Sequence, residues 1–147
     1  NLDTIVMNNM KLPAIHKEDL KPFPKLRYLW LNGNNLKIEK NLFKFNPHLE
    51  LISLAWMNIN SIHPHAFDNL HNLKTLWLDN NNCKVHLESA EENRSKVEEI
   101  VKQIQERACI DDSEDKDEII IELRRIIEEL QKQNEELRQQ KSYCKDW

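Results

Sequence analysis

An eleven-residue pattern recurs four times in the first half of the chain. Its clearest copy is LRYLWLNGNNL, residues 26–36, with leucine at the first, fourth, sixth and eleventh places and asparagine at the ninth. The copies begin at Leu2, Leu26, Leu49 and Leu73, so the period is 23 or 24 residues. Because apolar and polar residues alternate in each copy, the pattern predicts four strands that each bury one face.

A period of this length is typical of leucine-rich repeats, whose units contribute one strand each to a parallel sheet. We therefore expect residues 1–83 to form an α/β leucine-rich-repeat solenoid. Since the chain opens within a repeat, we read it as a C-terminal fragment of a longer repeat array. A second apolar pattern recurs between the strands; it comprises Ile15, Leu20, Ile38, Leu42, Phe43, Ile62, Ala66, Phe67 and Leu70.

The ninth place of the pattern predicts how each repeat bends after its strand. In leucine-rich repeats an asparagine here satisfies backbone groups in the bend, and Asn34 and Asn81 fit that role. Met10 and Met57 occupy the same place in the other two copies and lack the carboxamide. We expect those two bends to be less regular, with the thioether filling space.

The residues between the leucines are expected on the concave surface of the array, which makes them candidates for binding. Three of the four tryptophans of the chain occupy such positions. Exposed aromatic residues are enriched at protein contacts, although large side chains on adjacent strands can also stack and stiffen a sheet. Both readings stay open for the six candidates: Arg27, Tyr28, Trp30, Trp56, Lys74 and Trp77.

The repeat stops after Leu78, and an open repeat array needs a terminal cap. Residues 84–110 are the expected cap, because their apolar residues lie on one face of a helix. Cys83 and Cys109 flank this segment, and a disulfide between them would pin the cap to the array; two reduced, buried thiols are the alternative. The apolar face of the expected helix comprises Val97, Ile100, Val101, Ile104 and Ala108.

Residues 111–117 are acidic and polar, which predicts a solvated hinge, and residues 118–147 predict a coiled coil. The heptad places a are Ile120, Ile127, Asn134 and Lys141, and the d places are Leu123, Leu130, Leu137 and Cys144. Isoleucine at a with leucine at d favours a parallel dimer. One asparagine at an a place fixes the register of the helices and the number of strands in the coiled coil.

Two other arrangements of this segment remain open. A rival seam would place glutamine at two of its positions; it comprises Ile119, Leu123, Ile126, Leu130 and Leu137. The helix could also pack as a hairpin against the cap helix, which needs no partner.

Several classes of function are poorly supported by the composition. The net charge is −4 without a cluster of basic residues, which argues against nucleic-acid binding. The chain has one glycine, so it has no glycine-rich phosphate loop, and it has no apolar run of about 18 residues that would span a membrane. His63 and His65 lack a third metal ligand, and no serine has the context of a nucleophile. We therefore expect no enzyme, cofactor or metal.

Asn93 begins an Asn-Arg-Ser sequon, which makes it a glycosylation candidate if the chain is secreted.

The order of repeats, helical cap with cysteines, and C-terminal heptads resembles that of the mosquito leucine-rich-repeat immune proteins, including the Plasmodium-responsive leucine-rich members. The resemblance rests on the repeats at Leu26 and Leu73, the segment between Cys83 and Cys109, and the heptads from Ile120.

That resemblance implies an extracellular protein, secreted into the haemolymph, that forms disulfide-linked homo- or heterodimers. It also implies binding and stabilisation of complement-like thioester proteins in defence against parasites and bacteria. For the bond between chains the position in the seam favours Cys144, with Cys83 or Cys109 as the alternative. Two other functions remain open: the ectodomain of a leucine-rich-repeat receptor or adhesion protein, and an intracellular scaffold with reduced cysteines and an unmodified Asn93.

Overall fold

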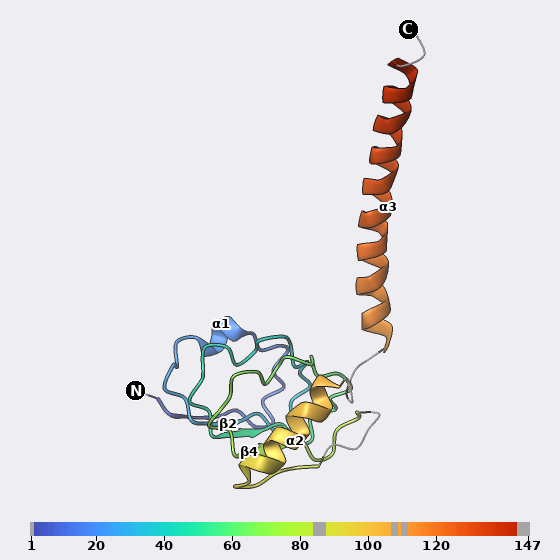
Figure 1. Cartoon of the computed structure of the whole chain (residues 1–147). Helices are drawn as coiled ribbons and strands as arrows, with labels where there is room; N and C mark the ends of the chain where they lie inside the picture. The colour runs from blue at the N-terminus through green and yellow to red at the C-terminus, as the bar shows by residue number, and fades with distance from the viewer. Residues whose placement is uncertain (1, 84–87, 107–108, 110–111, 144–147) are drawn as a thin grey trace. The chain divides into compact units, whose positions relative to one another are not determined.

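The computed structural model describes residues 2–83, 88–106, 109 and 112–143 (Figure 1). Contacts divide the chain into two units, residues 1–110 and 111–147, which are considered separately below. The elements are β1 (Thr4–Val6), α1 (Lys17–Leu20), β2 (Tyr28–Trp30), β3 (Leu51–Ser53), β4 (Thr75–Trp77), α2 (Arg94–Gln105) and α3 (Asp112–Tyr143).

The four strands form one parallel sheet in the order of the chain, β1-β2-β3-β4. Their central residues, Ile5, Leu29, Ile52 and Leu76, pair in register, and all four hold the fourth place of the repeated pattern. We call each strand with the segment that follows it a rung: residues 2–25, 26–48, 49–72 and 73–83. This arrangement is compatible with the predicted repeat array.

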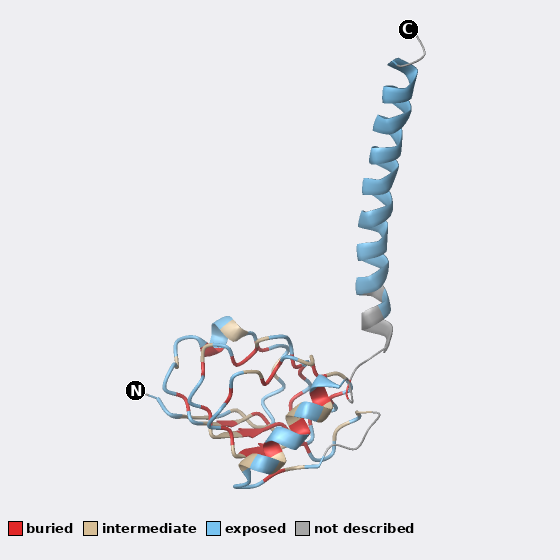
Figure 2. Cartoon of the chain, in the orientation of Figure 1, coloured by how far each residue is buried: buried red, intermediate tan, exposed pale blue. Residues whose placement is uncertain are grey.

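The core of the first unit lies between the sheet and the connecting segments (Figure 2). The leucines at the first, fourth and sixth places of rungs 2 and 4 are buried, as the pattern predicts. The connecting segments also stack, because Ile38 forms a parallel bridge with Ile62 and the rings of Phe43 and Phe67 lie 5.5 Å apart. Each rung therefore contacts its neighbours on both sides of the core.

Two asparagine side chains close the bends after the strands, as predicted for Asn34 and Asn81. Asn34 Nδ2 donates to the carbonyl oxygen of Leu31 in its own rung, at 2.7 Å, and to that of Met7 in rung 1, also at 2.7 Å. Its Oδ1 accepts from the backbone N–H groups of Met10 and Leu12 at 3.1 and 3.2 Å. A single carboxamide thus serves the bends of two rungs.

Asn81 repeats this arrangement one pair of rungs further along. Its Nδ2 donates to the carbonyls of Leu54 and Leu78, and its Oδ1 accepts from the N–H groups of Met57 and Ile59 at 3.0 and 3.1 Å. The rungs that carry methionine are therefore closed by the asparagine of the next rung.

The two methionines at this place differ in their surroundings. Met57 is fully buried, so its side chain fills space as predicted, but Met10 is 59% exposed and the prediction was wrong there. Met10 lies in the first rung, where no preceding strand in the described chain covers it.

Asn46 has a role that the pattern does not reveal. It lies three residues before Leu49, where Phe23 and Leu70 stand in other rungs, and it is buried. Its Nδ2 donates to the carbonyl oxygens of Leu20 and Phe23, both at 2.9 Å. The carboxamide therefore joins the connecting segments of two successive rungs.

The edge of the sheet at β4 is covered by the segment that follows rung 4. Leu76 and Ala90 exchange backbone hydrogen bonds of 2.8 and 2.9 Å in an antiparallel bridge. Helix α2 comes next, with Val97, Ile100 and Ile104 buried against the core. This helix occupies the place expected for the cap; Ala108, the last residue of its predicted apolar face, lies outside the described residues.

The predicted hinge was wrong for residues 112–117, because α3 begins at Asp112 and runs without interruption to Tyr143. The segment contains neither glycine nor proline, the residues that most disfavour a helix. Acidic residue types are also favoured in the first turn, where they interact with the positive end of the helix dipole.

Replacing Asn34 with alanine tests the role of the shared carboxamide. Asn34→Ala should lower the free energy of unfolding by about 2–4 kcal/mol, because two N–H groups and two carbonyls lose their partner. Urea unfolding of the Asn34→Ala protein measures the change. Asn35→Ala is the matched control, because Asn35 is the adjacent exposed residue; equal midpoints for the two variants would contradict the assignment.

Candidate functional site

A row of paired charges crosses the outer face of the sheet, which carries Thr4, Tyr28, Leu51, Thr75 and the residues beside them. Arg27 Nε donates to Glu50 Oε1 at 2.8 Å. Lys74 Nζ lies 4.0 Å from Glu50 Oε2 and 2.9 Å from Glu92 Oε2. The predicted binding residues Arg27 and Lys74 are therefore already neutralised by carboxylates of this chain.

The pairing is reflected in the acid–base properties of this row. The hydrogen bond from Arg27 holds the pKa of Glu50 below its usual value, against the opposing effect of partial burial. The hydrogen bond to Glu92 raises the pKa of Lys74, and that to Glu50 raises the pKa of Arg27. Arg27, Glu50 and Lys74 therefore remain charged at neutral pH.

The aromatic candidates on this face are only half-buried. The rings of Tyr28 and Trp30 stack within β2, with centroids 6.2 Å apart, and the Arg27 guanidinium carbon lies 5.0 Å from the Tyr28 centroid. Trp77 is also half-buried. Stacking therefore occurs within one strand rather than between strands, and it gives Tyr28 and Trp30 a structural role beside any role in binding.

Trp56 differs from the other candidates. It lies three residues beyond the end of β3 and is 66% exposed. By contrast, Ser53 and Thr75, which the repeat also places on the outer face, are buried. Ser53 Oγ donates to Asn32 Oδ1 at 2.6 Å, and Thr75 Oγ1 accepts from the N–H of Glu92 at 3.0 Å.

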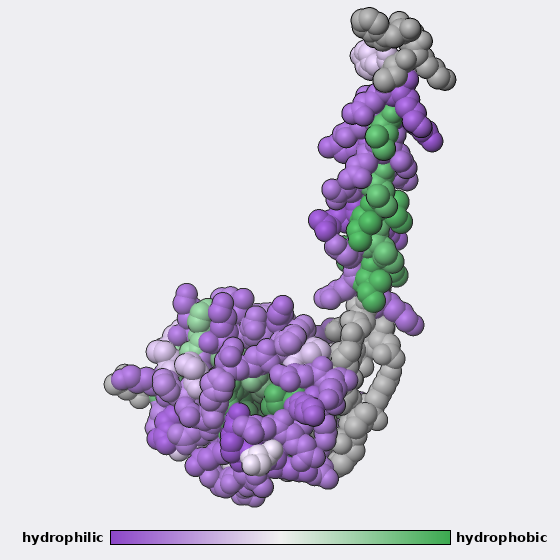
Figure 3. All heavy atoms as spheres, viewed as in Figure 1, coloured by the Kyte–Doolittle hydropathy of each residue, from purple (hydrophilic) through white to green (hydrophobic). Residues whose placement is uncertain are grey.

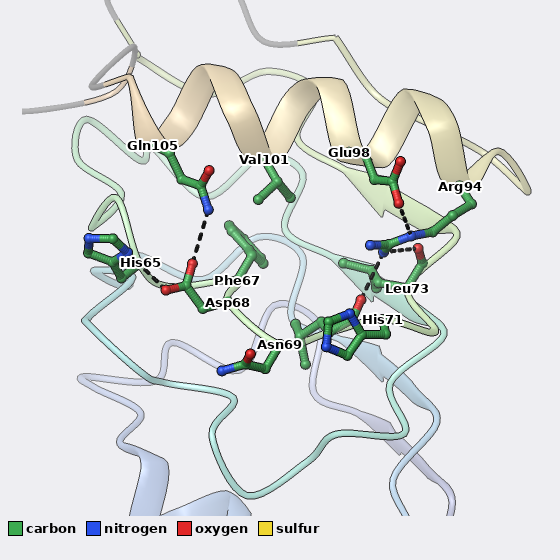
Figure 4. Close-up of a pocket in the computed structure, with 11 residues that line it drawn as sticks. His65, Phe67, Asp68, Asn69, His71, Leu73, Arg94, Glu98, Val101 and Gln105 are labelled. Carbon is green, nitrogen blue, oxygen red and sulfur yellow. Dashed lines mark hydrogen bonds and ion pairs between the residues drawn. The ribbon is translucent and has the colours of Figure 1, made fainter.

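A hollow of about 510 Å³ lies between α2 and the connecting segment of rung 3 (Figure 4). Phe67, Leu70, Leu73 and Val101 form its apolar part, and polar side chains line the rest. Helix α2 and this connecting segment both belong to the first unit.

The polar groups of this hollow bond mainly to one another. His65 Nδ1 lies 2.8 Å from Asp68 Oδ2, and Gln105 Nε2 donates to Asp68 Oδ1 at 3.1 Å. Arg94 Nη1 donates to the carbonyls of Leu70 and Leu73, both at 2.8 Å, while its Nε donates to Glu98. These contacts fasten α2 to the rungs, which explains the polar groups without a ligand.

His63 and His65 of the IHPHAF segment are the residues that the sequence offers for a metal site. The rings of His63 and His65 lie 5.8 Å apart. Within the part of the chain that the structure describes, no group of three or more histidine, cysteine, aspartate or glutamate side chains is placed to hold a metal ion.

Cys83 and Cys109 lie at disulfide distance, with Cα atoms 4.8 Å apart. The bridge joins the end of rung 4 to the residues after α2. Backbone hydrogen bonds flank it, because Ile62 N–H donates to the carbonyl of Cys109 and Asn82 N–H donates to that of Ile59, both at 2.7 Å. This pairing is the predicted one.

Helix α3 carries a stripe of exposed apolar side chains along its length (Figure 3). Every side chain of α3 that the structure describes is exposed. The apolar residues of the predicted seam are each 44–55% exposed: Ile120, Leu123, Ile127, Leu130 and Leu137. The stripe is widest in its first half, because Ile119 and Ile126 are also exposed, at 53% and 43%.

Two other predicted seam residues complete this description. Asn134 is exposed with the rest of the helix. Cys144, the predicted interchain cysteine, lies outside the described residues.

Asn93, the glycosylation candidate, is the N-cap of α2. Its Oδ1 accepts from the backbone N–H of Lys96 at 3.0 Å. A glycan would be attached through Nδ2, so this cap and glycosylation are compatible.

Among the described helices, none has the length and apolar character needed to cross a membrane.

Comparison of the chain with protein-family models, with curated proteins and with solved structures finds no match in any of the three.

Breaking the Cys83–Cys109 bridge should destabilise the first unit. For a separation of 26 residues, the Cys83→Ser variant should lose roughly 3–4 kcal/mol of unfolding free energy, because the unfolded chain is no longer constrained. Urea unfolding under non-reducing conditions gives the value. Adding reductant should lower the urea midpoint of the wild-type protein to that of the variant. A wild-type midpoint that is unchanged by reductant would show that the bridge does not contribute to stability.

The ion pairs of Glu50 predict that its contribution to the free energy of unfolding depends on pH. Because its pKa is lowered in the folded state, Glu50 stabilises the fold above its unfolded pKa, and the effect is lost as the pH falls through the folded pKa. The Glu50→Gln variant should therefore unfold at lower urea than wild type at pH 7, with the difference shrinking below pH about 4.

Glu91→Gln removes an exposed carboxylate from the segment beside this row and serves as the control. A difference between wild type and Glu50→Gln that grew on acidification would contradict the assigned ion pairing.

Proposed function

We propose that this chain is a leucine-rich-repeat interaction scaffold that associates through a coiled coil formed by α3. The observation that carries the proposal is the exposed apolar stripe of α3. A 32-residue helix of this kind, with every described side chain exposed, has little to stabilise it in water when isolated. Burying the stripe against another helix would supply the missing stabilisation.

The heptad chemistry supports association between helices in parallel. Ile120 and Ile127 at a, with Leu123 and Leu130 at d, match the preference of two-stranded coiled coils. Asn134 at a would restrict the number of strands and the register, at some cost in stability. In a parallel pair the two copies of Cys144 would also face each other across the seam.

The first unit supports the scaffold half of the proposal. Its short parallel strands, which recur at a period of 23 or 24 residues, are compatible with a repeat array. The polar side chains that meet near α2 bond to each other and to backbone carbonyls, so they have a structural explanation. We assign this unit to binding and not to catalysis.

The resemblance to mosquito leucine-rich-repeat immune proteins supplies the rest of the proposal. On this resemblance we propose that the protein acts outside the cell as a disulfide-linked homo- or heterodimer that binds and stabilises complement-like thioester proteins. The pairing of Cys83 with Cys109 fits an oxidising compartment, and the exposed Asn93 is accessible to glycosylation.

Charged residues in the seam should separate the copies. In a Cys144→Ser background, which removes the proposed bond between chains, the variant Leu130→Glu/Leu137→Glu should be monomeric where the Cys144→Ser protein is a dimer, because buried carboxylates without partners oppose association. Light scattering after size exclusion measures the mass, and the unfolding midpoint of the first unit should not change.

The matched control carries the same substitution on the opposite side of the helix. Lys132 and Gln139 occupy the f places of the same heptads, so Lys132→Glu/Gln139→Glu should remain dimeric. A dimer that survives the Leu130→Glu/Leu137→Glu change would overturn the assigned seam.

A further inference from the structure

Trp56 has a backbone conformation that tryptophan rarely adopts. Its φ is 57°, in the left-handed region that favours glycine and asparagine. The residues at the same place in the other three rungs are Asn9, Gly33 and Asn80, with φ of 54°, 70° and 58°. The bend therefore has a positive φ at this place in all four rungs, and in rung 3 the residue at this place is a bulky aromatic one.

The bend around Trp56 is held firmly by its neighbours. The N–H of Trp56 donates to the carbonyl of Asp79 at 3.0 Å, and the N–H of the next residue, Met57, donates to Asn81 Oδ1 at 3.0 Å. Met57 itself is fully buried. Strained backbone persists only where the surroundings determine it, and such positions cluster at functional sites.

Packing within the fold does not explain the choice of tryptophan. The side chain is 66% exposed, and it makes no hydrogen bond or ring stacking contact with any described residue. Glu92 also has a positive φ and is neither asparagine nor glycine. Its side chain has a role within the fold, because its carboxylate pairs with Lys74. Lys11 also has positive φ, but its flexible side chain is not bulky.

The setting of Trp56 is rigid and nearly uncharged. At the same place in the preceding rung stands Gly33, where a Cβ would overlap the carboxamide of Asn9. Asn32 Oδ1 accepts from the N–H of Ala55 at 2.9 Å, which ties the two bends together. The other residues at the seventh and eighth places of rungs 2 to 4 are Asn32, Gly33, Ala55, Asp79 and Asn80.

We infer that Trp56 is the anchor through which the first unit binds a protein partner, and that the partner offers an uncharged, apolar pocket to the indole. This inference rests on the proposed scaffold function and locates its contact. Tryptophan is enriched among the residues that dominate protein interfaces, and the centres of interfaces are depleted in charge. Among the described residues at the seventh and eighth places of rungs 2 to 4, Asp79 is the one that carries a charge, whereas Arg27, Glu50, Lys74 and Glu92 on the outer sheet face are paired within the chain.

The rigid bend explains why strain is tolerated here. An anchor held in place before binding loses less conformational freedom when the complex forms. The outer sheet face, with its stacked Tyr28 and Trp30, would then flank the contact rather than form its centre.

The test compares Trp56→Asn with wild type in the full chain. Asparagine is the residue that Asn9 and Asn80 provide at this place, so the variant should melt at the wild-type temperature or above it. The partner is first identified by placing the photoreactive residue p-benzoylphenylalanine at position 56 and analysing cross-linked proteins from the natural source by mass spectrometry. The cross-linked protein is then purified, and its affinity for wild type and Trp56→Asn is measured by calorimetry.

We expect Trp56→Asn to lose affinity for that protein by about 30-fold or more, as is typical of a dominant interface residue. Tyr143→Asn is the matched control, because it removes another exposed aromatic side chain, 78% exposed, outside the coiled-coil seam; it should bind like wild type. Both variants should keep the mass of the wild-type oligomer in light scattering.

Unchanged affinity of Trp56→Asn for a protein that wild type binds would overturn the anchor and leave the scaffold function standing. Failure of wild type to bind any protein, or a marked fall in the melting temperature of Trp56→Asn, would also overturn it. Binding of oligosaccharides instead of a protein would mean that the exposed ring serves a different ligand class. Loss of the wild-type oligomer itself would count against the scaffold function, separately from Trp56.

Discussion

The hydrogen bonds of Asn34 and Asn81 are the interactions on which the first unit most depends. Each carboxamide satisfies two N–H groups and two carbonyls in buried or half-buried bends. Each of these hydrogen bonds contributes a net of about 0.5–1 kcal/mol to stability. Because each carboxamide serves its own rung and the one before it, the bends are fixed in pairs, and the strands they follow are held in register.

Much of this arrangement can be predicted from the repeated pattern, and some cannot. The period of 23 or 24 residues predicts which leucines are buried and which residues share a place along the sheet. It does not reveal that Asn34 closes the bend at Met10, because the contact joins residues 24 positions apart in neighbouring rungs. Asn46 is hidden for the same reason. Its partners, Leu20 and Phe23, become neighbours only when the rungs stack.

The sequence predicts which residues stand at the outer-face positions of the sheet, but it does not predict how far each of them is buried. Alternation places Tyr28, Trp30 and Trp77 on the outer face, but their partial burial depends on side chains of adjacent rungs. The pairing of Arg27 with Glu50 likewise depends on the spacing between strands, which brings the second places of successive repeats together. The sequence makes Trp56 one of six candidates, but only its positive φ distinguishes it from the other five.

The two units obtain their stability in different ways. The first has a buried core, a bridge between Cys83 and Cys109, and a helix that covers the last rung. In the second, the described side chains of α3 are all exposed, so the helix has no core of its own. We therefore expect the first unit to fold by itself, and we propose that α3 is completed by association.

Hydrogen exchange followed by mass spectrometry at several protein concentrations tests this difference most directly. The account predicts that protection of peptides from 118–143 rises with concentration, because association stabilises the helix by mass action. Protection of peptides from 26–78 should stay constant over the same range. Equal protection of 118–143 at every concentration, down to conditions where light scattering finds only monomer, would contradict the account.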